Sequence, residues 1–115
     1  MMGTISTHVL DLARGTPAKG VAVRLEIHRG DKGWVKLAEK RTDDDGRAPT
    51  LIAAGSALDA GRYRLTFGVG EYFRASGSPS FYGDVPVEFE VRDADQKYHV
   101  PLLVSPFGYS TYRGS

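Results

Sequence analysis

The sequence predicts an all-β sandwich formed by a single domain over residues 1–115. Apolar and polar residues alternate with a period of two in several short segments, as in strands that bury one face and expose the other. These segments begin about a dozen residues apart and are separated by turn-forming residues, which is typical of sandwiches. A chain of 115 residues is most simply one domain, and it buries roughly 65% of the surface that its unfolded form exposes.

The predicted elements follow one another along the whole chain. Strands are expected at about 4–12, 21–28, 34–42, 62–67, 85–92, 98–105 and 109–113, the last two forming a hairpin. Loops are expected at 15–20 and 43–46, where Gly, Pro and Asp cluster. One short helix is expected at about 71–75, because Glu71 favours its start and Gly77 and Pro79 end it.

The segment 98–105 differs from the other predicted strands, because apolar residues occur at both its odd and its even positions. A two-layer sandwich buries only one face of each sheet, so the second apolar face predicts a partner, most simply another copy of the chain. Pro101 lies inside this segment and lacks the N–H that a central strand donates. It therefore predicts an edge strand or a local bulge.

The composition excludes several classes of protein. Fifteen basic and 14 acidic residues give a net charge of +1, with no basic cluster of the kind that binds nucleic acid. There is no cysteine, so disulfides and thiolate metal sites are excluded. No apolar run approaches the roughly 20 residues of a membrane span, and the first residues do not resemble a secretory signal. These observations favour a cytoplasmic protein with no membrane or nucleic-acid partner.

Histidines are the first candidates for chemistry, because neutral imidazole is a suitable general base near pH 7. His28 alternates onto a solvated face and has a structural interpretation. His8 and His99 lie on faces that an oligomer would bring together, so they are candidates for one shared site. A zinc site formed by all three histidines is a weak alternative, since no close-spaced ligand pair occurs.

Arg47 follows the acidic turn 43–46 directly and has two interpretations. It is either a surface arginine paired with the aspartates of that turn, or a planar fork that binds a carbonyl-rich substrate. The residue pattern alone leaves both open.

Several motifs resemble the transthyretin-like family of 5-hydroxyisourate hydrolases. The first is Ser-Thr-His-Val-Leu-Asp at 6–11, continued by the loop 14–18, and the second is the stretch 99–115, which ends in Tyr-Arg-Gly-Ser. Asp-Gly-Arg at 45–47, Gly-Arg-Tyr at 61–63 and Gly-Glu-Tyr-Phe at 70–73 are also similar to the family. The resemblance covers nearly the whole chain, and the Tyr-Arg-Gly-Ser ending distinguishes the hydrolases from transthyretin itself.

The resemblance implies a transthyretin-like β-sandwich of two four-stranded sheets with one short helix. It also implies a homotetramer, a dimer of dimers, with sites in a central channel. The implied reaction of urate breakdown is the hydrolysis of 5-hydroxyisourate to 2-oxo-4-hydroxy-4-carboxy-5-ureidoimidazoline, a cyclic amide hydrolysis without metal or organic cofactor.

Carried over to this chain, the family's catalytic residues correspond to His8, Arg47, His99 and Ser115, and its substrate-binding residues to His8, Arg47 and Tyr112. One of the two histidines is expected to activate water, and which one stays open at this point. Arg47 is expected to stabilise the oxyanion, Ser115 to orient a histidine or the substrate, and Tyr112 to narrow the channel.

Two non-catalytic functions are the alternatives. A transthyretin-like carrier would bind a small ligand in an open, mostly apolar channel, whereas His8, Arg47, His99 and Tyr112 predict a polar and constricted one. An adhesion sandwich would expose a solvated face on its last two strands, and the apolar residues of 98–105 argue against it.

Overall fold

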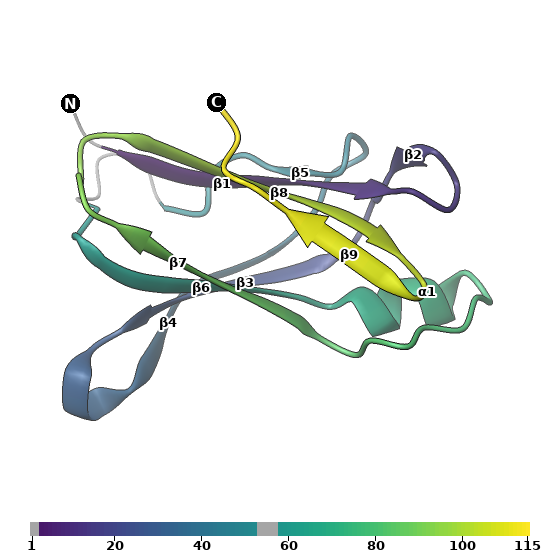
Figure 1. The fold of residues 1–115 in the computed structure, drawn as a ribbon, viewed down its shortest axis with the longest axis horizontal. Coiled ribbons are helices and arrows are strands. Elements are labelled where there is room, and N and C mark those ends of the chain that lie inside the picture. The colour runs from purple at the N-terminus through teal and green to yellow at the C-terminus, as the bar shows by residue number, and fades with distance from the viewer. Residues whose placement is uncertain (1–2, 53–57) are drawn as a thin grey trace.

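The computed structural model describes residues 3–52 and 58–115, and these form two β-sheets stacked face to face (Figure 1). Residues 1–2, part of the N-terminal stretch that does not resemble a secretory signal, lie outside the described ranges. The elements are β1 (Thr4–Asp11), β2 (Thr16–Pro17), β3 (Ala22–His28), the 3-10 helix η1 (Gly30–Lys32), β4 (Trp34–Arg41), β5 (Arg47–Ala48), β6 (Gly61–Phe67), α1 (Val69–Ala75), β7 (Val85–Val91), β8 (Lys97–Ser105) and β9 (Gly108–Thr111). No helix among the described residues is long and apolar enough to cross a membrane.

The predicted all-β sandwich with one short α-helix is confirmed. One sheet has four strands in the order β4-β3-β6-β7, and all its pairs are antiparallel. The other has the order β2-β1-β8-β9, with β5 also pairing with β1, so it contains five strands. Two of its five strands, β2 and β5, have only two residues each. The parallel pair β1–β8 forms its centre and sets the positions of the candidate site residues.

The seven longer strands occur where the sequence predicts them, and the differences lie at the ends of elements. Helix α1 begins two residues before the predicted start, at Val69, because Val69 and Phe73 are both buried and anchor one face at i, i+4 spacing. The strands β2 and β5 lie within and directly after the predicted loops 15–20 and 43–46. Each forms only two residue pairs with β1, which is too short to give a periodic pattern.

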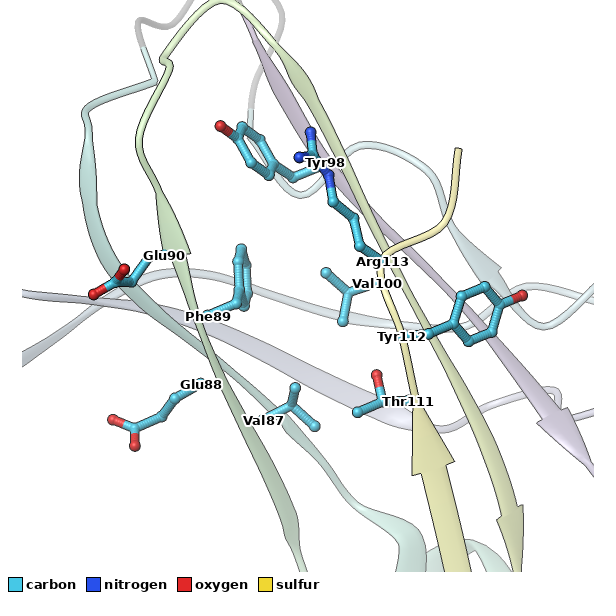
Figure 2. Close-up of a pocket in the computed structure, with 9 residues that line it drawn as sticks. All are labelled: Val87, Glu88, Phe89, Glu90, Tyr98, Val100, Thr111, Tyr112 and Arg113. Atoms are coloured by element: carbon cyan, nitrogen blue, oxygen red, sulfur yellow. The ribbon is translucent and has the colours of Figure 1, made fainter.

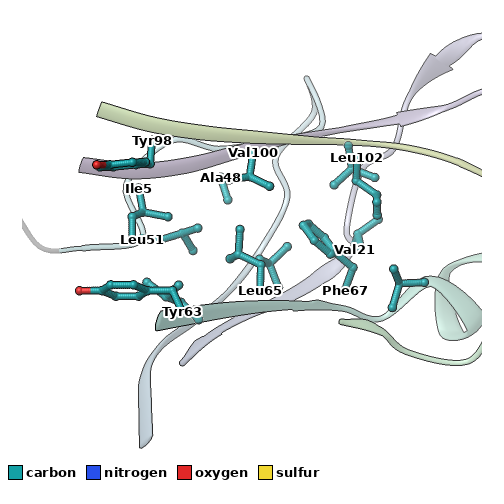
Figure 3. Packing of buried hydrophobic residues seen from close by; sticks show 14 of the residues in the cluster. Ile5, Val21, Ala48, Leu51, Tyr63, Leu65, Phe67, Tyr98, Val100 and Leu102 are labelled. Carbon is teal, nitrogen blue, oxygen red and sulfur yellow. The ribbon is translucent and has the colours of Figure 1, made fainter. Parts of the chain in front are cut away.

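The core lies between the sheets and is formed mainly by alternate side chains of β1, β3, β6, β7 and β8 (Figure 3). In β1, alternate residues from Ile5 to Asp11 are buried, whereas Ser6, His8 and Leu10 are half-buried on the outer face. Burying each large apolar side chain stabilises the fold by roughly 1.5–3 kcal/mol. Burial of one face sets the side on which each side chain of β1 and β8 lies. It therefore also places His8 and His99 on the outer face of the sheet.

Pro101 is neither in an edge strand nor at a bulge, so that prediction is wrong. β8 lies between β1 and β9, and one register runs through the pairs Leu102–Thr111 and His99–Gly114. In the described chain, the pairing is interrupted between them, where proline has no N–H to donate. The Pro101 carbonyl oxygen instead accepts the hydroxyl of Thr111 at 2.7 Å. The interrupted pairing, without any change of register, accommodates the proline.

Candidate active site

A cavity of about 290 Å³ opens where β1, β5, β8 and the C-terminal segment, residues 112–115, meet. It contains three of the residues that the sequence singled out, Arg47, His99 and Ser115. Its complete lining is Thr4, Ser6, Thr7, Arg47, Pro49, Lys97, His99, Gly114 and Ser115. These residues come from both ends and the middle of the chain, and the sheet brings them together.

His99 is held at this cavity by a residue whose role the sequence did not reveal. Ser6 lies directly opposite His99 in the parallel β1–β8 pair, and its Oγ is 2.8 Å from Nδ1 of the imidazole. Ser6 shares the outward parity of His8, but its contact with His99 depends on the register between two strands 93 positions apart. The first motif contains Ser6, and only that motif could have drawn attention to it.

The imidazole of His99 has a lowered pKa. Partial burial is the main cause, because it disfavours the charged ring, and the nearby charges of Arg47 and then His8 lower the pKa further. The ring is therefore predominantly neutral near pH 7 and can accept a proton.

Arg47 reaches the cavity from β5, where it pairs with His8 of β1. The preceding turn is held by Asp43, whose Oδ1 accepts the backbone N–H groups of Asp45 and Arg47, each at 2.9 Å. Within residues 3–52 and 58–115, the Arg47 guanidinium has no ion-pair or hydrogen-bond partner. Asp43 therefore binds the backbone and not the guanidinium, which is suited to bind an anionic or carbonyl oxygen.

His8 lies beside this cavity but is not among its lining residues. Its Nε2 is 2.8 Å from the carbonyl oxygen of Asp45. Because a carbonyl only accepts, Nε2 must carry the hydrogen, and the ring ties β1 to the turn that carries Arg47. His28 lies in the other sheet and contacts Trp34 edge to face at 5.2 Å between ring centroids.

Tyr112 lies outside the cavity of Arg47 and His99 within a single chain. Its side chain is 57% exposed and borders a second cavity of about 240 Å³, between the edge strands β7 and β9 (Figure 2). That cavity is lined by Val87, Glu88, Phe89, Glu90, Tyr98, Val100, Thr111, Tyr112 and Arg113. The assignment of Tyr112 to substrate binding therefore stays a prediction.

Residues 5–114 match the family model described as the HIUase/Transthyretin family. The chain belongs to this family.

The chain is similar both to proteins named 5-hydroxyisourate hydrolase and to proteins named transthyretin. It is 51% identical to a 5-hydroxyisourate hydrolase of Caulobacter vibrioides, over 99% of this chain and all of that protein. The structure of Klebsiella pneumoniae 5-hydroxyisourate hydrolase is 39% identical, with a TM-score of 0.85, over 97% of this chain and 99% of that chain. Sea bream transthyretin in complex with thyroxine is 32% identical, with a TM-score of 0.90, over 96% of this chain and 94% of that chain. The HIUase/Transthyretin fold is therefore shared by proteins of both names, and residues at the site must decide between functions.

Proposed function

We propose that this chain hydrolyses 5-hydroxyisourate to 2-oxo-4-hydroxy-4-carboxy-5-ureidoimidazoline in the breakdown of urate, without a metal or organic cofactor. One observation carries the proposal: a neutral imidazole, His99, lines the same small cavity as Arg47, whose guanidinium has no partner among the described residues. Hydrolysis of a cyclic amide needs a base for water and a donor for the developing oxyanion. Similarity to proteins named 5-hydroxyisourate hydrolase supports the choice of substrate.

His99 is the better candidate for the general base. His8 uses its Nε2–H on the Asp45 carbonyl, whereas among the described residues Nε2 of His99 has no partner. For Nε2 of His99 to take a proton from water, Nδ1 must carry the ring hydrogen and donate it to Ser6 Oγ. The lowered pKa keeps Nε2 unprotonated at neutral pH. General-base assistance of this kind accelerates reactions by about 10²–10⁴-fold.

Arg47 supplies the complementary charge. When water attacks a ring carbonyl of the substrate, negative charge develops on the oxygen, and a guanidinium presents several N–H donors to it. Removing one such donor typically lowers turnover by about 10²–10³-fold. Arg47 also lowers the pKa of His99, so it acts on the base and on the oxyanion.

The remaining assigned residues have supporting roles in the proposal. Ser115 lines the cavity and is suited to orient the substrate or His99. His8 binds the 45–47 turn and adds positive charge when protonated, so it is proposed to place Arg47 and to assist substrate binding. Tyr112 is proposed to reach the substrate channel in the assembled protein.

The assembly we propose is a homotetramer, a dimer of dimers. Among the described residues, β7 and β9 each form one edge of a sheet, and edges of this kind favour pairing with another copy. Four large aromatic side chains are also exposed on nearby segments, Phe81, Phe107, Tyr109 and Tyr112. Light scattering should give four times the 12.5 kDa mass of one chain, and a monomeric mass would contradict the assembly.

The alternative function is a small-ligand carrier without catalysis, as the resemblance to thyroxine-bound transthyretin suggests. The cavity of Arg47 and His99 argues against it, because three cationic or titratable side chains line it, Arg47, Lys97 and His99. Its volume also lies near the lower limit of ligand pockets, which span roughly 300–1,000 Å³.

The decisive experiment follows the ultraviolet absorbance of freshly prepared 5-hydroxyisourate with and without the protein. The wild-type chain should accelerate its decay, and His99→Ala and Arg47→Ala should each lower the rate by about 10²-fold or more. His28→Ala is the matched control, since His28 lies in the other sheet. Decay at the spontaneous rate with wild-type protein would exclude the enzyme and favour the carrier.

A further inference from the structure

The C-terminal segment is only weakly held by the sheet, although two of its residues line the candidate active site. β9 pairs with β8 as far as Thr111, and regular pairing then stops because Pro101 has no N–H. A single further pair follows in the same register, in which the N–H of Gly114 donates to the carbonyl oxygen of His99 at 2.7 Å. One isolated pair beyond a strand end gives little order by itself, since chain ends fray unless they are tied down.

Arg113 provides a second attachment beside this isolated pair. Its guanidinium carbon lies 4.5 Å from the centre of the Tyr98 ring, in cation–π contact. Its Nη2 donates to Oε1 of Gln96 at 2.9 Å and to the carbonyl oxygen of Lys97 at 3.2 Å. Figure 2 shows Arg113 running along β8 toward the Tyr98 ring, while Tyr112 projects to the other side of the segment. The side chain therefore ties residue 113 to the start of β8.

The surface that receives Arg113 is rigid. Tyr98 is 5% exposed, and its hydroxyl donates to the carbonyl oxygen of Asp93 at 2.9 Å and accepts the N–H of Asp93 at 3.2 Å. A buried ring fixed by two hydrogen bonds holds a cation in a defined place. Arg113 lines the cavity between β7 and β9. It also lines a neighbouring surface hollow formed with Glu90, Arg92, Asp93, Gln96 and Tyr98. It does not line the cavity of Arg47 and His99.

The contact of Gly114 with His99 links this attachment to the site. A Cβ placed on Gly114 would lie 2.7 Å from Cδ2 of His99, so the segment packs directly against the imidazole. Ser6 holds the same ring at Nδ1. Loss of the segment would uncover one side of the ring and displace Ser115 from the cavity.

We propose that Arg113 is a positioning residue for the proposed hydrolysis: it anchors the C-terminal segment so that Gly114 packs on His99 and Ser115 faces the cavity. This inference rests on the proposed function. Arg113 does not line the cavity of Arg47 and His99, so in this proposal it acts through the backbone of its neighbour and through His99.

The test compares Arg113→Ala and Arg113→Lys with wild type. Arg113→Ala should lower kcat by about 10–100-fold with a smaller change in KM, because small displacements of catalytic groups cost about this much. Arg113→Lys should lie between the two, since an ammonium keeps the cation–π contact but lacks the planar fork. Arg92→Ala is the matched control, because Arg92 lies at the same end of the molecule with its side chain 88% exposed.

A second readout, NMR titration of the His99 ring, does not depend on activity. The charges of Arg47 of β5 and His8 of β1 act on this ring, Lys97 of β8 lines the same cavity, and none of the three is changed. Uncovering the ring in Arg113→Ala should raise its titration midpoint toward the ordinary value of about 6.5. The signals are assigned by their loss in His99→Gln.

The two proposals fail in different ways. If wild-type protein does not hydrolyse 5-hydroxyisourate, the proposed function fails, while the ring titration still tests the anchoring. An unchanged titration midpoint in Arg113→Ala would overturn the positioning role, whether or not kcat falls. If thermal unfolding shows that Arg113→Ala does not fold, kcat and the His99 titration midpoint are compared between Arg113→Lys and wild type instead. Wild-type values of both in Arg113→Lys would then overturn the positioning role.

Discussion

The hydroxyl oxygen of Ser6 lies 2.8 Å from Nδ1 of His99, across two neighbouring parallel strands. A hydrogen bond to one imidazole nitrogen determines which nitrogen is available for chemistry and holds the ring in one orientation. In the proposed reaction Nδ1 donates this hydrogen bond to Ser6, and Nε2 is then the nitrogen that acts on water. Ser6 thus belongs to the candidate site although it would not itself take part in bond making.

Ser6→Ala is expected to lower kcat by a factor of about ten or less, since one hydrogen bond contributes about 0.5–1.5 kcal/mol and 1.4 kcal/mol is tenfold. KM should change less, because the ring and not the substrate loses a partner. Steady-state kinetics with 5-hydroxyisourate measures both. Ser76→Ala is the control, because it also removes a hydroxyl that makes one hydrogen bond, at the end of helix α1. Equal kcat values for Ser6→Ala and wild type would show that the contact does not orient the base.

The proposed role of His99 as the base predicts how the reaction rate depends on pH. Its pKa is lowered, first by burial and then by Arg47 and His8, so the neutral ring persists below its ordinary pKa of about 6.5. A general base is active when unprotonated, so kcat/KM should be constant near pH 7 and fall as pH decreases through a midpoint below 6.5. In Arg47→Ala the cation is absent and the midpoint should move upward. A midpoint above 6.5 in wild type, or no acidic limb, would exclude His99 as the base.

The fold could be predicted from the sequence because burial sets its main features. Alternation in segments such as 21–28 and 85–92 follows directly from a sheet with one face against a core. The short strands β2 and β5 escaped prediction, since two residues have no period. Pro101 misled the prediction because its carbonyl oxygen finds a partner in the Thr111 hydroxyl of the next strand, and the local pattern does not show this contact.

The candidate site could be predicted only as a set of residues. Motifs pointed to Arg47, His99 and Ser115, and the structure brings these three to one cavity. The motifs did not separate the roles of His8 and His99, because these depend on a carbonyl at Asp45 and a hydroxyl at Ser6. Such contacts arise from the parallel register of β1 and β8 and from the turn before β5, which only the folded chain defines.

Gly46 is expected to be essential for the placement of Arg47. It has φ +75°, its carbonyl oxygen accepts the N–H of Val9 at 2.7 Å, and an added Cβ would overlap the Val9 carbonyl oxygen. Gly46→Ala should therefore destabilise the protein and lower kcat together. Gly20→Ala is the control, because φ is +79° and the space around it is open. The control should lose only the roughly 1–2 kcal/mol of a left-handed backbone, with normal kcat.

Chemical denaturation and steady-state kinetics on both glycine variants test this expectation. If Gly46→Ala loses no more stability than Gly20→Ala, the close approach to β1 is not a constraint. Normal turnover in a folded Gly46→Ala protein would show that Arg47 does not depend on the turn.

Asp11 links the end of β1 to helix α1 and is expected to matter for stability. It is 2% exposed, its Oδ1 accepts the N–H groups of Ala13 and Arg14 at 2.9 and 3.1 Å, and its Oδ2 accepts the Tyr72 hydroxyl at 2.8 Å. Burial and this carboxylate raise the pKa of Tyr72, so the hydroxyl stays protonated as the donor. Tyr72→Phe should cost about 0.5–1.5 kcal/mol, and Asp11→Ala about 2–4 kcal/mol, since it leaves several groups without a partner.

Urea unfolding of the two single variants and the double variant, at one protein concentration, separates these contributions. In the Asp11→Ala background Tyr72→Phe should cost less than it does in wild type, because the acceptor is already gone. Equal costs in the two backgrounds would mean that the hydrogen bond between Tyr72 and Asp11 adds nothing to stability. Because Asp11 lies on the buried side of β1 and the candidate site on its outer side, kcat of the folded Tyr72→Phe protein should remain that of wild type. A large fall in kcat would instead show that the junction of β1 and α1 transmits its geometry to the cavity.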